Sequence, residues 1–222
     1  MPVQPFLCPE LSTVPSLEAP LEEAFLENLL QLPLHPLRVA DRYHPATVYL
    51  GWAEDQLFVV ARQEDRDIHS TSTDRNQPLW ALGDVFEIFL QVDGHPDYLE
   101  LHVSPNAHTL QLRFPSEAEM RADRVKGKGL LAKYTLGGDL FDFRVRFRPE
   151  GWDVLALLPF ETIRPGFTRD GNRTLRASFC RYDYSRDTEE PDLSSTSLHA
   201  TPDFHRLFEW LSITLAPCTS GE

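Results

Sequence analysis

An alternation of apolar and polar residues, continued across consecutive turns, constrains the fold of this chain more than any other feature. Residues 93–96, Asp-Gly-His-Pro, fit a four-residue loop between two strands. This loop sets apolar residues opposite each other on one face: Leu90 with Leu99, Ile88 with Leu101, and Phe86 with Val103. On the other face it pairs Gln91 with Tyr98, Phe89 with Glu100, and Glu87 with His102. A slip of one residue would mix the two faces, so the register is well specified.

Two further turns extend this pattern. A loop at residues 104–107 sets Leu101 opposite Leu110 and Leu99 opposite Leu112, with Glu100 facing Gln111 and Tyr98 facing Arg113. A turn at residues 148–151 pairs Phe147 with Trp152, Val145 with Val154, and Phe143 with Ala156. The same turn places Arg146 across from Asp153, a favourable cross-strand pair. The pattern therefore predicts a meander with one apolar face and one polar-aromatic face, and a separate late hairpin. We expect Trp52 and Trp152 to be core residues, and Trp80, which follows a polar loop, to be at least partly exposed.

Further strands are expected in four segments, at residues 47–52, 56–62, 175–182 and 207–215. Long polar loops are expected at residues 68–79, 116–129 and 183–202. About nine or ten strands with short turns, and at most one or two short helices, predict an all-β fold. We expect a two-sheet antiparallel β-sandwich of the immunoglobulin or jelly-roll kind.

The first 45 residues differ from the rest because they are rich in proline, which favours an extended course over a surface. We expect residues 1–45 to form a Pro-rich N-terminal extension packed on the domain. One short helix is expected at residues 21–30, between Pro20 and Pro33. Residues 46–222 then form the sandwich, which makes the chain a single domain overall.

The formal net charge of −13 over 222 residues argues against two classes of partner. An acidic surface repels nucleic acid phosphates and anionic lipid headgroups, so neither a nucleic acid nor a membrane is an expected partner. No window approaches the roughly 18 apolar residues of a membrane span. Residues 1–8 lack the basic and apolar regions of a signal peptide, which leaves the compartment undecided. Cys8, Cys180 and Cys218 show neither metal-ligand nor disulfide spacing, so we expect buried or unreactive thiols.

The sequence contains no nucleophile elbow, phosphate-binding loop, zinc helix or paired-cysteine motif. Glu87 and Glu100 share one predicted sheet face, as would the two carboxylates that flank the scissile bond in a glycosidase. Most carboxylates on a shared face do no chemistry, so an enzyme is the less favoured interpretation. His199 and His205 are a weak indication of a metal, and surface histidines explain them more simply; any metal is unknown.

Trp80 precedes the strand that carries Glu87, at the end of a polar loop. Sugars present apolar C–H patches that stack on an aromatic ring, and hydroxyl groups that hydrogen-bond polar side chains. Trp80, Glu87, Gln91 and His102 supply such a set. The same pattern equally fits a core or hinge tryptophan beside a solvated strand face, and the residues alone leave both interpretations open.

Five segments, taken in order, resemble the motifs of one family. They are residues 50–59 (LGWAEDQLFV), 80–90 (WALGDVFEIFL), 98–106 (YLELHVSPN), 151–160 (GWDV leading to LPF) and 202–207 (PDFHRL). Together, over about residues 45–215, they resemble carbohydrate-binding module family 9 and its broader relatives. The resemblance implies a β-sandwich that binds a sugar, often a chain end, between two aromatic rings. It also implies attachment to secreted glycoside hydrolases such as xylanases, a secreted or periplasmic location, and structural calcium as a possible cofactor.

The resemblance assigns roles to individual residues. Trp80 matches one tryptophan of the aromatic clamp, and Glu87 matches a glutamate that binds hydroxyl groups. His102 stands where characterised members have an arginine. The second clamp tryptophan falls near Leu198 or His199, and His199 is the candidate for weak stacking there. Arg181 resembles a polar strand-end position of the broader relatives.

These observations favour a non-catalytic carbohydrate-binding module, with Trp80, Glu87, His102, Arg181, His199 and Gln91 as candidate ligand-binding residues. One alternative is a sandwich with a structural or interaction role whose sugar site has decayed. Another is an accessory domain or an enzyme of a glycoside hydrolase system that uses Glu87 and Glu100. The sequence names neither the sugar nor the oligomeric state.

Overall fold

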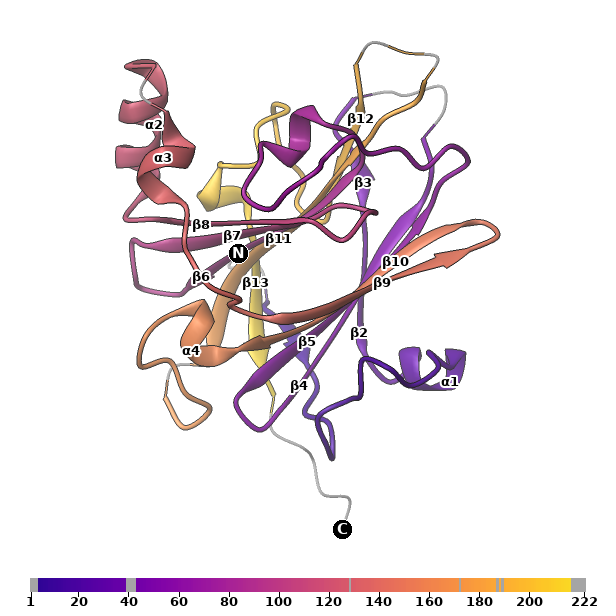
Figure 1. The fold of residues 1–222 in the computed structure, drawn as a ribbon. Coiled ribbons are helices and arrows are strands. Elements are labelled where there is room, and N and C mark those ends of the chain that lie inside the picture. The colour runs from indigo at the N-terminus through magenta and orange to yellow at the C-terminus, as the bar shows by residue number, and fades with distance from the viewer. Residues whose placement is uncertain are drawn as a thin grey trace.

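The computed structural model describes residues 4–38, 43–127, 129–171, 173–186, 188 and 190–216, and these residues form two stacked β-sheets (Figure 1). The larger sheet has the order β1-β13-β11-β6-β7-β8, and β12 continues from β11 to β3. Its strands are β1 (Phe6–Cys8), β3 (His35–Pro36), β6 (Val85–Val92), β7 (Tyr98–Val103), β8 (Thr109–Phe114), β11 (Thr174–Asp183), β12 (Asp192–Ser195) and β13 (Leu211–Leu215). The smaller sheet, in order, contains β2 (Leu30–Pro33), β4 (Ala46–Ala53), β5 (Gln56–Glu64), β10 (Gly151–Pro159) and β9 (Asp142–Arg148).

The expected two-sheet sandwich is confirmed, with one correction to its strand directions. β1 runs parallel to β13, whereas the other pairs of strands among the described residues are antiparallel. The main core lies between the sheets and is built from the alternate residues that face inward. Trp52 and Trp152 are both buried in it, as the apolar pairing predicted, with exposed fractions of 1% and 0%.

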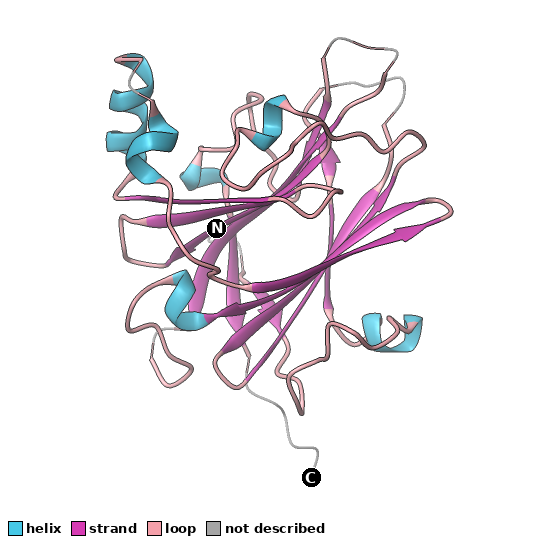
Figure 2. Ribbon diagram, viewed as in Figure 1, coloured by secondary structure: helices cyan, strands magenta, loops and turns pink. Residues whose placement is uncertain are grey.

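Helices lie around the two layers of strands rather than between them (Figure 2). The described residues hold four α-helices, more than the one or two expected: α1 (Glu23–Leu26), α2 (Glu117–Val125), α3 (Leu130–Tyr134) and α4 (Phe160–Ile163). Two 3-10 helices, η1 (Leu79–Ala81) and η2 (Leu207–Glu209), precede β6 and β13. Residues 207–209, expected as strand, belong to η2. No helix among the described residues has the length and apolar character needed to cross a bilayer.

Helix α2 occupies a segment that we expected to be a polar loop, residues 116–129. The start of this segment nevertheless contains a helix-capping sequence. The hydroxyl of Ser116 accepts a hydrogen bond from the backbone N–H of Glu119 at 3.2 Å, which caps the helix. Ser-x-x-Glu is the capping-box pattern, so helix chemistry, rather than strand periodicity, decides this segment.

The N-terminal residues contribute strands to both sheets. β1 pairs with β13, β2 pairs with β4, and β3 pairs with β12. The helix expected at residues 21–30 is shortened to α1, because Leu30 already belongs to strand β2. Cys8 and Cys180 are buried free thiols, as expected, and Cys218 lies outside the described residues. The proline-rich segment thus supplies strands as well as extended cover.

Two of the three predicted registers are confirmed. β6 and β7 pair Phe86 with Val103, Glu87 with His102 and Leu90 with Leu99, so Glu87 and His102 are cross-strand neighbours. β9 and β10 pair Phe147 with Trp152 and Arg146 with Asp153. Asp153 forms its ion pairs with Arg148, at 2.8 Å, and with Arg62, at 3.9 Å.

The register predicted for β7 and β8 is wrong by one residue. Leu101 pairs with Gln111 and His102 pairs with Leu110. The loop contains one residue more than expected: the backbone N–H of Ser104 donates to the carbonyl of His108 at 3.0 Å, and Ala107 adopts a left-handed conformation with φ of 63°. This extra residue turns Leu110, Leu112 and Phe114 to the face that carries Glu87 and His102, and that face is therefore largely apolar.

The left-handed Ala107 supplies a test of this loop. Ala107 is exposed, and a non-glycine residue in this left-handed conformation is strained by about 1–2 kcal/mol. Glycine removes the strain, but the greater freedom of the unfolded chain with glycine offsets part of the gain in stability. We predict that Ala107→Gly stabilises the protein by about 0.5–1 kcal/mol in urea unfolding. Ala118→Gly, in the exposed part of α2, should instead destabilise it. A loss of stability for Ala107→Gly would contradict the five-residue loop.

Candidate functional site

A second apolar cluster covers the outer face of the larger sheet, the face that points away from the smaller sheet. Figure 1 shows η1, α2, α3 and the segment that leads to η2 on this side. The cluster joins β6, β7, β8 and β11 to these covering segments through Phe89, Tyr98, Leu112, Phe114, Met120, Tyr134, Phe204 and Trp210, among others. The polar-aromatic strand face that we expected to be open to solvent is thus largely buried.

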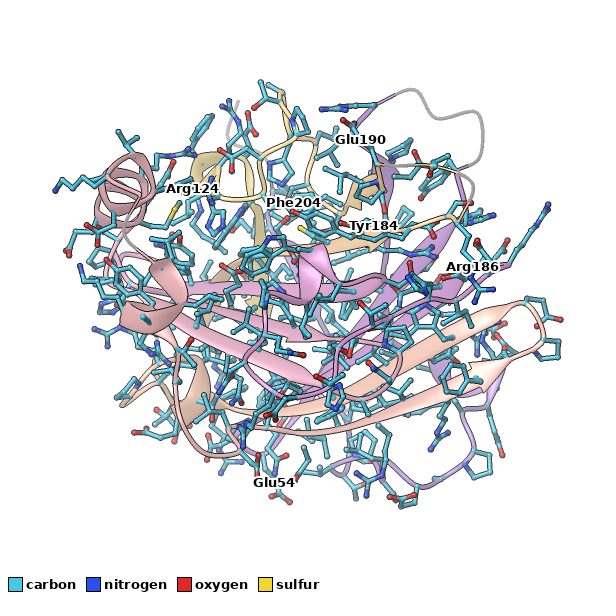
Figure 3. The ribbon with its side chains drawn as sticks, turned by 45° about the horizontal axis from the view of Figure 1, so that its top comes forward. Glu54, Arg124, Tyr184, Arg186, Glu190 and Phe204 are labelled. Atoms are coloured by element: carbon cyan, nitrogen blue, oxygen red, sulfur yellow. The ribbon has the colours of Figure 1, made fainter. Side chains whose placement is uncertain are left out.

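A cavity of about 340 Å³ opens into this cluster. Aromatic side chains line it from five different segments: Trp80, Phe89, Phe114, Tyr182 and Phe204. Its polar lining consists of Glu87, Glu100, Arg124, Asp203 and His205. Arg124 on α2 and Phe204 on the segment before η2 are labelled in Figure 3. Apolar walls with a few convergent polar groups are the usual composition of a small-molecule site.

Trp80 lies in η1 at the edge of the cavity and is half-buried, as the sequence predicted for a tryptophan that is at least partly exposed. Its ring packs against the imidazole of His102, with 5.6 Å between the ring centroids. The hydroxyl of Tyr184 donates a hydrogen bond to the backbone carbonyl of Trp80 at 2.6 Å. Trp80 is therefore held in place by its neighbours while it contributes to the cavity wall.

His102 lies beneath the cavity between two buried carboxylates. Its Nε2 is 2.6 Å from Glu100 Oε1, and its Nδ1 is 3.1 Å from Glu87 Oε1. All three side chains are at least 95% buried. Burial and the negative charge of Glu100 raise the pKa of Glu87 to about 8, although the charge of His102 acts to lower it. Burial opposes protonation of His102, but the two carboxylates outweigh it and raise the pKa of the imidazole.

Glu100 has a second oxygen, Oε2, which is buried and has no hydrogen-bond partner among the described residues. It lies 3.6 Å from Nε2 of His205, whose Nδ1 is hydrogen-bonded to the hydroxyl of Tyr98 at 2.9 Å. Burial lowers the pKa of His205 to about 4, so this imidazole is neutral near pH 7. Burial acts to raise the pKa of Glu100, but His205 and the hydrogen bond with His102 hold it below its ordinary value.

The remaining charged groups lie at the rim of the cavity. Arg121 Nη1 is 2.9 Å and Arg124 Nη1 is 3.6 Å from the carboxylate of Asp203. These ion pairs join α2 to the segment that carries Phe204 and His205. They therefore fix two walls of the cavity relative to each other.

Gln91 and His199 lie outside the cavity lining. The amide of Gln91 donates to the carbonyl of Pro96 at 3.3 Å, within the β6–β7 hairpin. The imidazole of His199 is fully buried, 3.0 Å from Glu209 Oε2 and 3.4 Å from the Ser178 hydroxyl. Of the six candidate residues, Trp80 and Glu87 line the cavity and His102 supports its floor.

Arg181 is buried in a cluster of charges instead of facing the cavity. Its side chain has an exposed fraction of 0%, and Nη2 lies 3.1 Å from both Asp65 Oδ2 and Asp183 Oδ1. Nη1 donates to the carbonyl of His44 at 3.3 Å. These contacts give Arg181 a role in stability.

The same cluster tests the expectation of structural calcium. Among the described residues, one group of side chains has the geometry to hold a metal ion: His44, Asp65 and Asp183. Calcium prefers six to eight oxygen ligands, whereas this group offers two carboxylates and an imidazole. The guanidinium of Arg181 already neutralises both carboxylates. The donor set does not fit calcium.

Several lining residues were missed by sequence reasoning. Phe204 and His205 belong to the segment 202–207 that carried part of the family resemblance, which could have marked them. Tyr182 follows Arg181 on β11 and points to the opposite face of the sheet. Arg124 depends on α2, whose capping-box signal was the available clue.

Fold and cavity together define a β-sandwich protein with a small-molecule pocket on the outer face of one sheet. Solved structures with this fold include a family 9 carbohydrate-binding module from Caldicellulosiruptor kristjanssonii in complex with cellotriose, with 14% sequence identity, a TM-score of 0.68, and coverage of 97% of this chain and 95% of that chain. A family 9 module from the same organism in complex with glucose matches with 15% identity and a TM-score of 0.63, over 97% and 98% of the two chains. A protein of Bacteroides uniformis matches with 12% identity and a TM-score of 0.67, over 96% and 100%.

The chain therefore has the fold of the family 9 carbohydrate-binding modules, as its motifs indicated. The likeness covers nearly the whole of each chain. No protein-family model matches the sequence, and no curated protein matches it.

The burial of Arg181 leads to a stability prediction. Arg181→Met would leave Asp65 and Asp183 buried without their cation, and breaking a buried ion pair in this way costs about 3–5 kcal/mol. We expect that loss in urea unfolding at neutral pH, and a smaller loss near pH 5, where Asp183 is largely protonated because burial raises its pKa to about 6. A variant of unchanged stability that has lost ligand binding would show instead that Arg181 contacts the ligand.

The raised pKa of Glu87 leads to a prediction about pH. A carboxyl whose pKa rises on folding binds its proton more tightly in the native state, so stability falls as the pH rises from its ordinary pKa of 4.5 towards about 8. We predict that Glu87→Gln removes this contribution, so its stability relative to wild type improves between about pH 5 and about pH 8.5. Urea unfolding at both pH values measures the effect, with Glu119→Gln as the exposed control. Parallel pH profiles for Glu87→Gln and wild type would contradict it.

Proposed function

We propose that this chain is a non-catalytic carbohydrate-binding module whose outer-face cavity holds one sugar residue at the end of a saccharide chain. One observation carries the proposal: in a fold shared with modules solved with cellotriose and glucose, the cavity brings a half-buried tryptophan and two buried carboxylates together. Its volume of about 340 Å³ lies at the small end of ligand pockets, roughly 300–1,000 Å³.

The walls and the floor of the cavity have separate roles in this proposal. Trp80 stacks on the apolar face of the sugar ring, and Phe204 takes the place of the second aromatic ring, because no tryptophan stands near residue 198 or 199. Glu87 and Glu100 hydrogen-bond the hydroxyl groups from below. His102 orients both carboxyl groups without touching the sugar, since it does not line the cavity.

The arrangement of the carboxylates favours binding over hydrolysis. A glycosidase places its two carboxyl groups on either side of the scissile bond, about 5–9.5 Å apart, with each free to act on the substrate. Here one oxygen of each glutamate contacts the same imidazole, at 3.1 and 2.6 Å. Both carboxylates are thereby held to the floor of one pocket.

We predict that Trp80→Ala abolishes sugar binding while the fold is retained. Truncating an aromatic anchor commonly costs more than about 2 kcal/mol, which is a loss of roughly 30-fold in affinity. Calorimetry of wild type and variant against mono- and oligosaccharides measures the loss, and the same mixtures are assayed for released products. Because Trp80 is half-buried, a modest decrease in melting temperature is expected.

Phe147→Ala is the matched control, because this phenylalanine on β9 is 65% exposed and lies outside the cavity. It should bind sugars like wild type. Equal binding by Trp80→Ala and wild type would place the sugar site elsewhere. Product release by wild type would show an enzyme instead of a binding module.

A further inference from the structure

The floor of the cavity holds two buried carboxyl groups that form no ion pair with a lysine or arginine side chain among the described residues. Within the described part of the chain, Glu87 forms an ion pair with His102 only, and Glu100 with His102 and His205 only. His205 is neutral near pH 7 because burial lowers its pKa to about 4. A single imidazole ring is therefore shared between two buried carboxylates.

The one basic side chain that lines the cavity is engaged elsewhere. Arg124 is 45% exposed at the rim, and its guanidinium lies 3.6 Å from Asp203, which also lines the cavity. The lining thus presents three carboxyl groups and one guanidinium. Two of these carboxyl groups, Glu87 and Glu100, lie at the buried end of the cavity, away from the guanidinium of Arg124.

Glu100 also offers an acceptor that the protein leaves unused. Its Oε2 is buried without a hydrogen-bond partner among the described residues, and Nε2 of His205 lies 3.6 Å from it. An unsatisfied buried acceptor is costly, and a charged one more so. A ligand group that donates a hydrogen bond and carries a positive charge would both satisfy this acceptor and balance its charge.

We propose that the cavity selects a sugar residue with a free, protonated amino group, a hexosamine chain end, over the equivalent neutral sugar, and that it rejects uronic acids. This inference rests on the proposed function, since it concerns the same pocket. An amino sugar keeps the C–H face that stacks on Trp80 and adds an ammonium group with three hydrogen-bond donors. An ammonium group near an aromatic face gains a further cation–π attraction.

A metal ion fits this cavity less well than an ammonium group. Metal ligands converge on one point, and among the described residues only His44, Asp65 and Asp183 do so. In the cavity, both nitrogens of His102 face carboxylates on opposite sides of the ring.

Binding of an ammonium group should be linked to a proton. Burial, with the neighbouring Glu100, raises the pKa of Glu87 to about 8, so this carboxyl holds a proton near pH 7 when no ligand cation is present. A cation beside it favours the carboxylate, so the Glu87 O–H bond breaks and its proton passes to the buffer. A neutral sugar supplies no charge to replace that proton.

The test is calorimetry of the whole chain with glucosamine, glucose, N-acetylglucosamine and glucuronic acid near pH 6, where an amine with a pKa of roughly 7.7–8.0 is protonated. We expect glucosamine to bind at least about tenfold more tightly than glucose, as close charge pairs in interfaces allow. Glucuronic acid should bind most weakly. Near pH 7, the enthalpy for glucosamine should change with the ionisation enthalpy of the buffer, whereas that for glucose should not.

Glu100→Gln keeps the shape of the side chain and removes its charge, so it should abolish most of the preference for glucosamine over glucose. Glu119→Gln, on the exposed surface of α2, should leave the preference unchanged. If Glu100→Gln fails to fold, the comparison of sugars and buffers with the wild type decides the question.

Equal or tighter binding of glucose, or tightest binding of glucuronic acid, would overturn this inference and leave the proposed function standing. Absence of binding by these four sugars and by the oligosaccharide panel would overturn the proposed function, and the inference with it.

Discussion

Burial of the larger sheet on both faces is the constraint from which the site follows. Every residue of β6 and β7 is buried, although these strands carry Glu87, Glu100 and His102. A buried polar group that lacks a partner costs more than a typical hydrogen bond returns, so each of these side chains needs a partner inside the protein. His102 meets part of that need, because its Nε2 is hydrogen-bonded to Glu100 and its Nδ1 forms an ion pair with Glu87.

The same requirement explains the polar groups elsewhere on this sheet. Arg181 is buried against Asp65 and Asp183, and Ser178 is hydrogen-bonded to Ser195 at 2.9 Å. These groups satisfy one another and give the sheet a fixed arrangement. Glu100 lines the cavity, and its Oε2 has no hydrogen-bond partner among the described residues, so the same requirement marks this carboxyl group as one to which a ligand can donate a hydrogen bond.

Local chemistry made much of the sandwich predictable. The β6–β7 and β9–β10 registers follow from side-chain alternation around short loops, because one face of each hairpin has to be apolar. The β7–β8 register did not follow, because alternation by itself permits either register when the loop length is uncertain. Ala107 in a left-handed conformation adds one residue to the loop, and alanine gives no signal of that conformation. Helix α2 was missed although its capping box is present in the sequence.

The sequence by itself determined the two-sheet architecture, the core positions of Trp52 and Trp152, and the pairing of Glu87 with His102, because these depend on residues close together along a hairpin or on a strand period. Only the tertiary structure decided what covers the outer face of the larger sheet. Phe204 and His205 reach Glu100 from about 100 positions further along the chain. Such contacts depend on how covering segments pack, which side-chain period does not encode. Because of these contacts, the strand face that we expected to be open is the floor of a pocket that contains Glu87 and Glu100.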